Sequence, residues 1–112
     1  MTITIIGTGL IGGSLAISLR EQQLATTIIG VDQNQANLER AKALGLIDTF
    51  LPLEEAFAQS RLVILAIPVD GVLRLLPSLL DKATTQVIMD VGSTKGKILD
   101  LVKDHPHRGR FV

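Results

Sequence analysis

Short runs of apolar, mostly β-branched residues alternate along the chain with longer segments of helical periodicity. The apolar runs predict strands at residues 2–6, 26–31, 49–51, 62–66, 86–89 and 110–112. The segments between them predict helices at residues 10–22, 34–44, 53–59, 71–82 and 94–103. The strand runs are apolar on both faces, which is typical of a parallel sheet covered by helices on both sides. The pattern therefore predicts a doubly wound α/β fold with strand order 3-2-1-4-5-6.

Glycine and proline residues mark the ends of several predicted elements. Gly45 directly follows helix 34–44 and is predicted to end it at the C′ position. Pro52 suits the start of helix 53–59, because a proline costs no hydrogen bond there. Pro77 falls inside helix 71–82, where we expect it to break or kink the helix.

Composition limits the class of protein. A chain of 112 residues allows one domain, and the absence of cysteine excludes disulfides, thiolate metal sites and a cysteine nucleophile. Eleven basic and eleven acidic residues, with only three Phe as aromatics, do not favour nucleic-acid binding. No apolar run approaches the ~18 residues of a membrane span, and the first residues lack the features of a signal peptide. We expect a soluble cytoplasmic protein with no nucleic-acid or membrane partner.

The first predicted strand runs into a glycine-rich turn that opens the first predicted helix. The turn consists of Gly7, Thr8, Gly9, Leu10, Ile11 and Gly12. Gly7 would allow a tight turn, Gly9 a close approach of the backbone to a pyrophosphate, and Gly12 close packing of helix on sheet. The helix start offers free N–H groups and a positive dipole end to that phosphate. The motif therefore predicts a dinucleotide cofactor; a P-loop is excluded because no Lys follows Gly12.

Asp32 ends the second predicted strand, 20 positions after Gly12. A carboxylate there can accept hydrogen bonds from a ribose 2′-hydroxyl and repels a 2′-phosphate. No Arg follows closely, since Gln33 and Asn34 come next. This favours NAD over NADP, with Asp32 and Gln33 as cofactor-binding residues. A solvated, helix-capping Asp is the alternative interpretation of Asp32, and the two are compatible.

Further candidates follow the fourth and fifth predicted strands, whose carboxyl ends lie at the same edge of the sheet. Ile67, Pro68 and Val69 are predicted to form an apolar wall against the cofactor, with ordinary loop packing as the alternative. Ser93 opens the last predicted helix, either as a plain N-cap or as a hydroxyl beside the nicotinamide. Lys95 is more simply a solvated lysine.

Two histidines flank Pro106 just before the last predicted strand. His105 and His107 would therefore lie at its amino end, opposite the cofactor edge, and we interpret both as surface residues. No third ligand lies nearby in the sequence, so no metal site is predicted.

Several motifs together carry a resemblance to a known family. They are the run Gly7 to Ala16, then Gly30-Val31-Asp32, Gly45-Leu46-Ile47-Asp48, Leu65-Ala66-Ile67-Pro68-Val69 and Asp90-Val91-Gly92-Ser93-Thr94-Lys95. The chain resembles the prephenate dehydrogenase family, including its arogenate dehydrogenases, and its cofactor domain is a Rossmann fold. The resemblance implies an oxidoreductase of tyrosine biosynthesis that uses NAD to convert prephenate to 4-hydroxyphenylpyruvate and CO2. It also implies a catalytic role for Ser93, which would orient the family's catalytic histidine near the nicotinamide.

The chain departs from the family's pattern by its length. It stops at Val112, before the family's His-Pro-Met motif, which follows the sixth strand; His105 and Pro106 precede that strand. The family's helical second domain, which binds substrate and forms a homodimer, is also not included. Residues 1–112 are thus expected to be the NAD-binding domain alone, binding NAD without turning over prephenate.

Three alternative interpretations stay open from these residues. One is a stand-alone dinucleotide-sensing module, which would need no substrate domain. The others are the cofactor domain of an arogenate dehydrogenase, and that of a β-hydroxyacid dehydrogenase or imine reductase.

Overall fold

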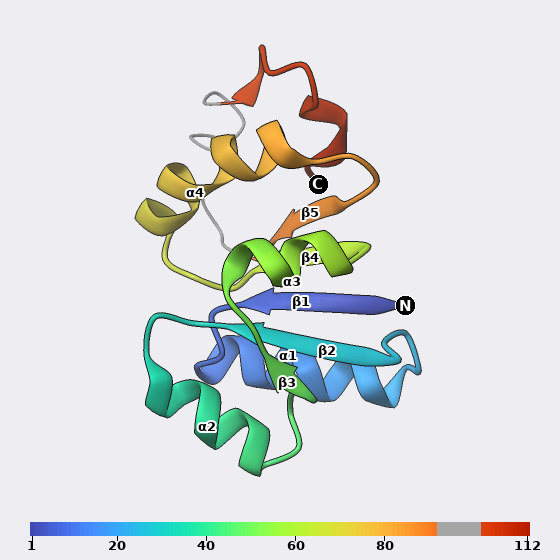
Figure 1. The fold of residues 1–112 in the computed structure, drawn as a ribbon, viewed down its shortest axis with the longest axis vertical. Coiled ribbons are helices and arrows are strands. Elements are labelled where there is room, and N and C mark those ends of the chain that lie inside the picture. Colours follow the sequence, from blue (N-terminus) through green and yellow to red (C-terminus); the bar gives the residue numbers. More distant parts are fainter. Residues whose placement is uncertain (92–101) are drawn as a thin grey trace.

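A parallel five-stranded sheet forms the centre of the computed structural model, which describes residues 1–91 and 102–112 (Figure 1). The strands are β1 (Thr2–Ile6), β2 (Thr27–Val31), β3 (Thr49–Phe50), β4 (Leu62–Leu65) and β5 (Val87–Asp90). Their order is β3-β2-β1-β4-β5, and every neighbouring pair is parallel. The predicted doubly wound Rossmann topology is therefore confirmed, with strand ends that differ from the prediction by a residue or so.

Helices cover both faces of this sheet. They are α1 (Leu10–Glu21), α2 (Gln35–Ala43), α3 (Leu53–Gln59) and α4 (Val69–Lys82). Ile3 of β1 belongs to a buried cluster with Ala16 of α1, whereas Ile6 belongs to a second cluster with Phe57 of α3 and Leu76 of α4. Figure 1 accordingly shows α1 behind the sheet and α3 in front of it. Burial on both faces explains why the strand sequences lack polar alternation.

Helix α4 differs from its prediction at two points. It begins at Val69 rather than residue 71, because Pro68 precedes it with a backbone suited to a helix start. It also continues through Pro77 to Lys82, so of the two outcomes expected at this proline the break is wrong and the kink stays a prediction. Four apolar side chains of the helix are almost completely buried: Val72, Leu76, Leu79 and Leu80. Burying several such side chains at about 1.5–3 kcal/mol each exceeds the roughly 3 kcal/mol cost of an interior proline.

The last predicted strand is reduced to a single bridge. Phe111 pairs in parallel with Ile88 of β5, after a short 3-10 helix over Arg108–Arg110. Phe111 thus occupies the sixth position of the predicted strand order. The predicted helix 94–103 falls, apart from its last two residues, outside the described residues.

Gly45 ends α2 as predicted. Its φ is +74°, and the N–H groups of Gly45 and Leu46 donate to the carbonyls of Lys42 and Ala41 at 3.0 and 2.9 Å. This is the hydrogen-bond pattern of a Schellman C-cap, in which glycine adopts the left-handed conformation without strain.

Within the described ranges, no helix is long and apolar enough to cross a membrane.

Candidate functional site

The glycine loop between β1 and α1 is packed tightly on two sides. Gly7 has φ +97° and donates its N–H to the Val31 carbonyl at 2.7 Å. A Cβ on Gly7 would lie 2.4 Å from the Ala66 carbonyl oxygen, and one on Gly12 would lie 1.9 Å from the Gly7 carbonyl oxygen. The tight turn predicted at Gly7 and the close helix packing predicted at Gly12 are both present.

Gly9 lies on the open side of the same loop. It is the N-cap residue of α1 and has no side chain to bond the helix start, and the first turn carries no acidic residue. Apart from its own chain neighbours, no described atom lies within 4 Å of the position that a Cβ on Gly9 would occupy. The first N–H groups of a helix lack intrahelical partners and carry a partial positive charge, so this end of α1 favours an anion.

Asp32 links the glycine loop to the end of β2. Its Oδ2 accepts hydrogen bonds from the Thr8 N–H at 2.9 Å, the Thr8 hydroxyl at 3.1 Å and the Asn37 side-chain amide at 3.4 Å. Its Oδ1 accepts one from the Asn34 N–H at 2.8 Å. Asn34 itself is the N-cap of α2, so Asp32 supports the start of that helix without being its cap.

These contacts set the charge of Asp32. Partial burial raises its pKa, but the hydrogen bonds from Asn34, Thr8 and Asn37 together outweigh that effect and hold the pKa below its ordinary value. Asp32 is therefore an anion at neutral pH. It combines strong acceptor oxygens with repulsion of any further negative charge nearby.

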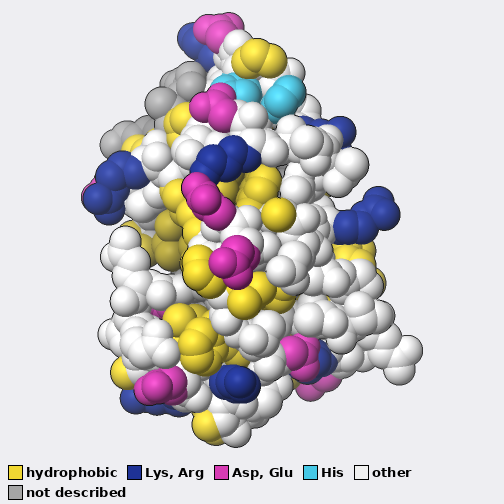
Figure 2. Space-filling view, in the orientation of Figure 1, with side chains coloured by type: hydrophobic (Ala, Val, Ile, Leu, Met, Phe, Trp, Pro, Cys, Tyr) yellow, Lys and Arg dark blue, Asp and Glu magenta, His cyan; other side chains and the backbone are white. Residues whose placement is uncertain are grey.

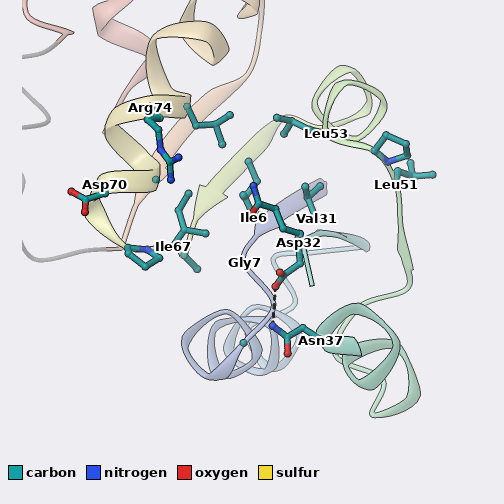
Figure 3. Close-up of a pocket in the computed structure, with 17 residues that line it drawn as sticks. Ile6, Gly7, Val31, Asp32, Asn37, Leu51, Leu53, Ile67, Asp70 and Arg74 are labelled. Carbon is teal, nitrogen blue, oxygen red and sulfur yellow. Dashed lines mark hydrogen bonds between the residues drawn. The ribbon is translucent and has the colours of Figure 1, made fainter. Parts of the chain in front are cut away.

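The open face of the loop and Asp32 border one cavity of about 950 Å³ at the carboxyl ends of β1, β2 and β4 (Figure 3). Of the predicted residues, those whose atoms line it are Gly7, Gly9, Asp32, Gln33, Ile67 and Pro68. Thr8 contacts the cavity's Asp32, Gly12 lies beneath the loop, and Val69 does not line the cavity. Ser93 and Lys95 lie outside the described residues, as do the side chains of Leu10 and Ile11.

The sequence interpretation missed the part of the cavity formed by helices. Leu53 comes from α3, Asn37 from α2, and Gly71, Arg74 and Leu75 from α4. Residues 71, 74 and 75 have the i, i+3, i+4 spacing of one helix face. The sequence places the start of α4 just after a strand end at the cofactor edge. That position and this spacing could have predicted that residues 71, 74 and 75 face the cavity.

The two histidines lie at the opposite end of the molecule, as predicted. His107 Nδ1 is 2.7 Å from the Leu80 carbonyl oxygen, and His105 Nε2 is 2.6 Å from Asp81 Oδ1, both at the end of α4. Both side chains reach the surface (Figure 2), although that of His105 is only 16% exposed. No three His, Cys, Asp or Glu side chains in the described part of the chain are placed to hold a metal ion.

A parallel sheet in this order, with a glycine loop opening α1 and an acidic residue ending β2, defines a nucleotide-binding domain of the Rossmann type. Comparison with known families identifies which family of nucleotide-binding domains this is. Residues 15–112 match the family model of the prephenate dehydrogenase nucleotide-binding domain, and the chain belongs to this family.

Similar proteins agree with that assignment. The chain is 35% identical over 118 aligned positions to prephenate dehydrogenase of Bacillus subtilis (strain 168), covering 99% of this chain and 31% of that enzyme. The structure resembles A. aeolicus prephenate dehydrogenase, determined in complex with hydroxyphenyl propionate and NAD+, at TM-score 0.79 and 29% identity. That match covers 99% of this chain and 40% of the other.

A third relative is named for a different substrate, arogenate. Synechocystis arogenate dehydrogenase matches at TM-score 0.78 and 29% identity, over 98% of this chain and 37% of that one. In all three comparisons the chain spans between about a third and two fifths of its relative's length.

Proposed function

We propose that this chain binds NAD and is the cofactor-binding domain of an NAD-dependent prephenate dehydrogenase. Family membership and the NAD+ held by the A. aeolicus relative support this proposal. The observation that carries it is the joint placement of two features in one cavity. The open, uncapped end of α1 at Gly9 suits a pyrophosphate, and the ionised Asp32 beside it suits a ribose diol.

The residues present fit a dinucleotide. Backbone N–H groups from Gly9 onward would hold the pyrophosphate, and Asp32 would accept from the ribose, while Ile67 and Pro68 offer an apolar surface to a ring. NAD, when bound, supplies an acceptor for hydride. The chain's own residues bind and orient that acceptor, and the packed glycine loop excludes side chains from the position of the phosphates.

The proposed reaction of the whole enzyme converts prephenate and NAD+ to 4-hydroxyphenylpyruvate, CO2 and NADH. Hydride leaves the ring carbon that bears the 4-hydroxyl, and loss of the carboxylate as CO2 makes the ring aromatic. The relatives are two and a half to three times as long as this chain. We therefore propose that residues 1–112 supply the cofactor site, with Ser93 near the nicotinamide. Substrate binding and a homodimer interface would reside in a helical domain, in a cytoplasmic enzyme.

Arogenate is the second candidate substrate, because an arogenate dehydrogenase matches this structure as well as a prephenate dehydrogenase does. Arogenate carries an amino group where prephenate carries a keto group, so the cofactor chemistry is the same for both. Comparing kcat/KM for the two compounds in the full-length enzyme separates these candidates.

The proposal is tested by calorimetric titration of the chain with NAD and NADP. We expect NAD to bind and NADP to bind at least tenfold more weakly, because a 2′-phosphate would face the Asp32 carboxylate. Asp32→Asn should lower NAD affinity by about tenfold, the usual size of a lost hydrogen bond to a charged group, and weaken the discrimination. Equal affinity of the unmodified chain for both cofactors would remove the role proposed for Asp32.

Gly9→Val tests the pyrophosphate site directly. The space around Gly9 is open, so the variant should fold without a steric clash. The valine side chain would then occupy the place of the phosphates. Gly109→Val is the matched control, because a Cβ on Gly109 also meets no atom of the described residues within 4 Å, its chain neighbours aside, and Gly109 lies away from the cavity. We expect the first variant to lose NAD binding and the control to keep it. Binding retained by a folded Gly9→Val variant contradicts the proposal.

A further inference from the structure

The cavity extends beyond the glycine loop and Asp32 into a space between α3 and α4. The side chains lining that extension are mostly apolar: Leu51, Leu53, Ile67 and Leu75. In the proposed binding mode the pyrophosphate lies at Gly9 and the adenosine ribose at Asp32. The adenine base, attached to that ribose on the side away from the phosphates, must continue into this apolar extension.

Arg74 reaches into the same extension from α4. Figure 3 shows its side chain directed toward the cavity, opposite Asp32 and Asn37, whereas Asp70 on the same helix points away. Among the described residues that line the cavity, Arg74 is the only cation. No hydrogen bond or ion pair within the described ranges engages its guanidinium, in contrast to Arg20, which pairs with Asp48 at 2.9 Å.

Arg74 is solvent-exposed, and the packing of α4 does not depend on it. It closes no ion pair with the described residues, and its helix is already anchored by Val72, Leu76 and Leu79 on the opposite, buried side. A planar cation at the rim of an apolar slot matches a flat, electron-rich ring, which it can cover with its own plane. The purine of the dinucleotide is such a ring.

Resting on the proposed function, we propose that Arg74 is a cofactor-binding residue that stacks its guanidinium on the adenine of the dinucleotide. One face of the purine would lie against the apolar wall that includes Ile67, and the other would be covered by Arg74. A contact with the pyrophosphate is disfavoured because that group is held at the end of α1. A contact with a 2′-phosphate is disfavoured by the ionised Asp32 in the same cavity.

The test measures binding of NAD, NADP and adenosine to Arg74→Met and Arg74→Lys, using calorimetry for the dinucleotides and NMR titration for adenosine. Arg61→Met is the matched control: Arg61 is also exposed, but it precedes β4 at the amino end of the sheet. Arg74→Met should lower the affinities for NAD and for adenosine by the same factor, about fivefold. The two losses should be equal because adenosine retains the base that Arg74 is proposed to cover and has no phosphate. Arg74→Lys should recover only part of this loss, since an ammonium has no plane to stack. Arg61→Met should leave both affinities unchanged.

Each other outcome has a defined meaning. If Arg74→Met loses affinity for NAD but not for adenosine, or if Arg74→Lys binds NAD as well as the unmodified chain does, Arg74 contacts a phosphate and the stacking proposal is overturned. A loss confined to NADP assigns it to the 2′-phosphate and also overturns it. Unchanged NAD affinity in Arg74→Met overturns the inference while the proposed function stands. If the unmodified chain binds no NAD, the proposed function fails, and this inference fails with it.

Discussion

Gly12 and Gly13 are adjacent in α1, and alanine at these two positions should have opposite effects on stability. A Cβ on Gly12 would lie 1.9 Å from the Gly7 carbonyl oxygen and 3.3 Å from Ile5 Cγ2. A Cβ on Gly13 would lie 3.1 Å from Leu46 Cδ1, the one atom within 4 Å among the described residues outside its own stretch of helix. The first obstacle is backbone held by the loop, whereas the second is the end of a flexible side chain.

The magnitudes follow from these distances. To relieve the contact at Gly12, α1 must move away from the loop by about 1.1 Å, to reach 3.0 Å. Overpacking of this kind costs roughly 3 kcal/mol, the upper end of its usual range, while alanine in place of glycine returns about 1 kcal/mol through helix propensity. Gly12→Ala should therefore lose about 2 kcal/mol and roughly 10 °C in Tm. Gly13→Ala needs only a small rotation of Leu46 and should gain about 0.5 kcal/mol.

Urea unfolding followed by far-ultraviolet circular dichroism measures both variants. We expect the midpoints to move in opposite directions with unchanged slopes, because the surface exposed on unfolding stays the same. Gly13→Ala should also keep the affinity for NAD, whereas the displaced loop of Gly12→Ala should weaken it. Equal stability of the two variants would show that α1 does not pack on the loop as described here.

Two further predictions concern other parts of the fold. Leu76→Ala should cost about 2–5 kcal/mol in urea unfolding, because Leu76 is fully buried in the cluster between the sheet and α4; a loss below 1 kcal/mol would contradict that packing. Asp48 has a lowered pKa, because the hydrogen bond from the Ile28 N–H at 2.7 Å and the Arg20 guanidinium outweigh a desolvation that raises it. Its contribution to stability is complete about one pH unit above the unfolded-state pKa of about 3.9 and is lost as the pH falls from there through the lower folded-state pKa. Asp48→Asn should thus be less stable than the unmodified chain at pH 7 and approach it at acid pH, and a difference independent of pH would refute this.

The fold was predictable because its determinants are local. Each apolar run is long enough for a buried strand, and Gly45 and Pro52 mark helix boundaries through backbone preferences that need no tertiary context. The break expected as one outcome at Pro77 does not occur, because the effect of a proline depends on tertiary context. The spacing of Val72, Leu76 and Leu79 indicates an apolar face, but how completely that face is buried against the sheet, and so whether it outweighs the proline, is set by the packing of the whole domain.

Part of the candidate site was predictable from the sequence, and part of it was not. The glycine loop and Asp32 lie directly after strands, so the parallel topology alone brings them to one edge. Asn37 and Arg74 lie inside helices, and their position at the cavity depends on the rotation of α2 and α4 about their own axes. Rotation is set by packing on the sheet, which the sequence indicates only through the spacing of apolar positions.

The contacts of Asp32 bear on how a ribose could bind there. Each carboxylate oxygen has about two acceptor positions, and the four donors from Thr8, Asn34 and Asn37 are unevenly shared, with three at Oδ2 and one at Oδ1. The two Thr8 bonds fix the carboxylate to the glycine loop, which holds the proposed ribose and pyrophosphate sites in constant relation and lowers the cost of binding. The Asn37 bond is the longest of the four, at 3.4 Å, and is the one that a ribose hydroxyl can replace at least cost. In the proposed complex, therefore, one ribose hydroxyl can donate to Oδ1 while all four existing bonds are kept, and a second hydroxyl of the diol would displace Asn37 rather than Thr8.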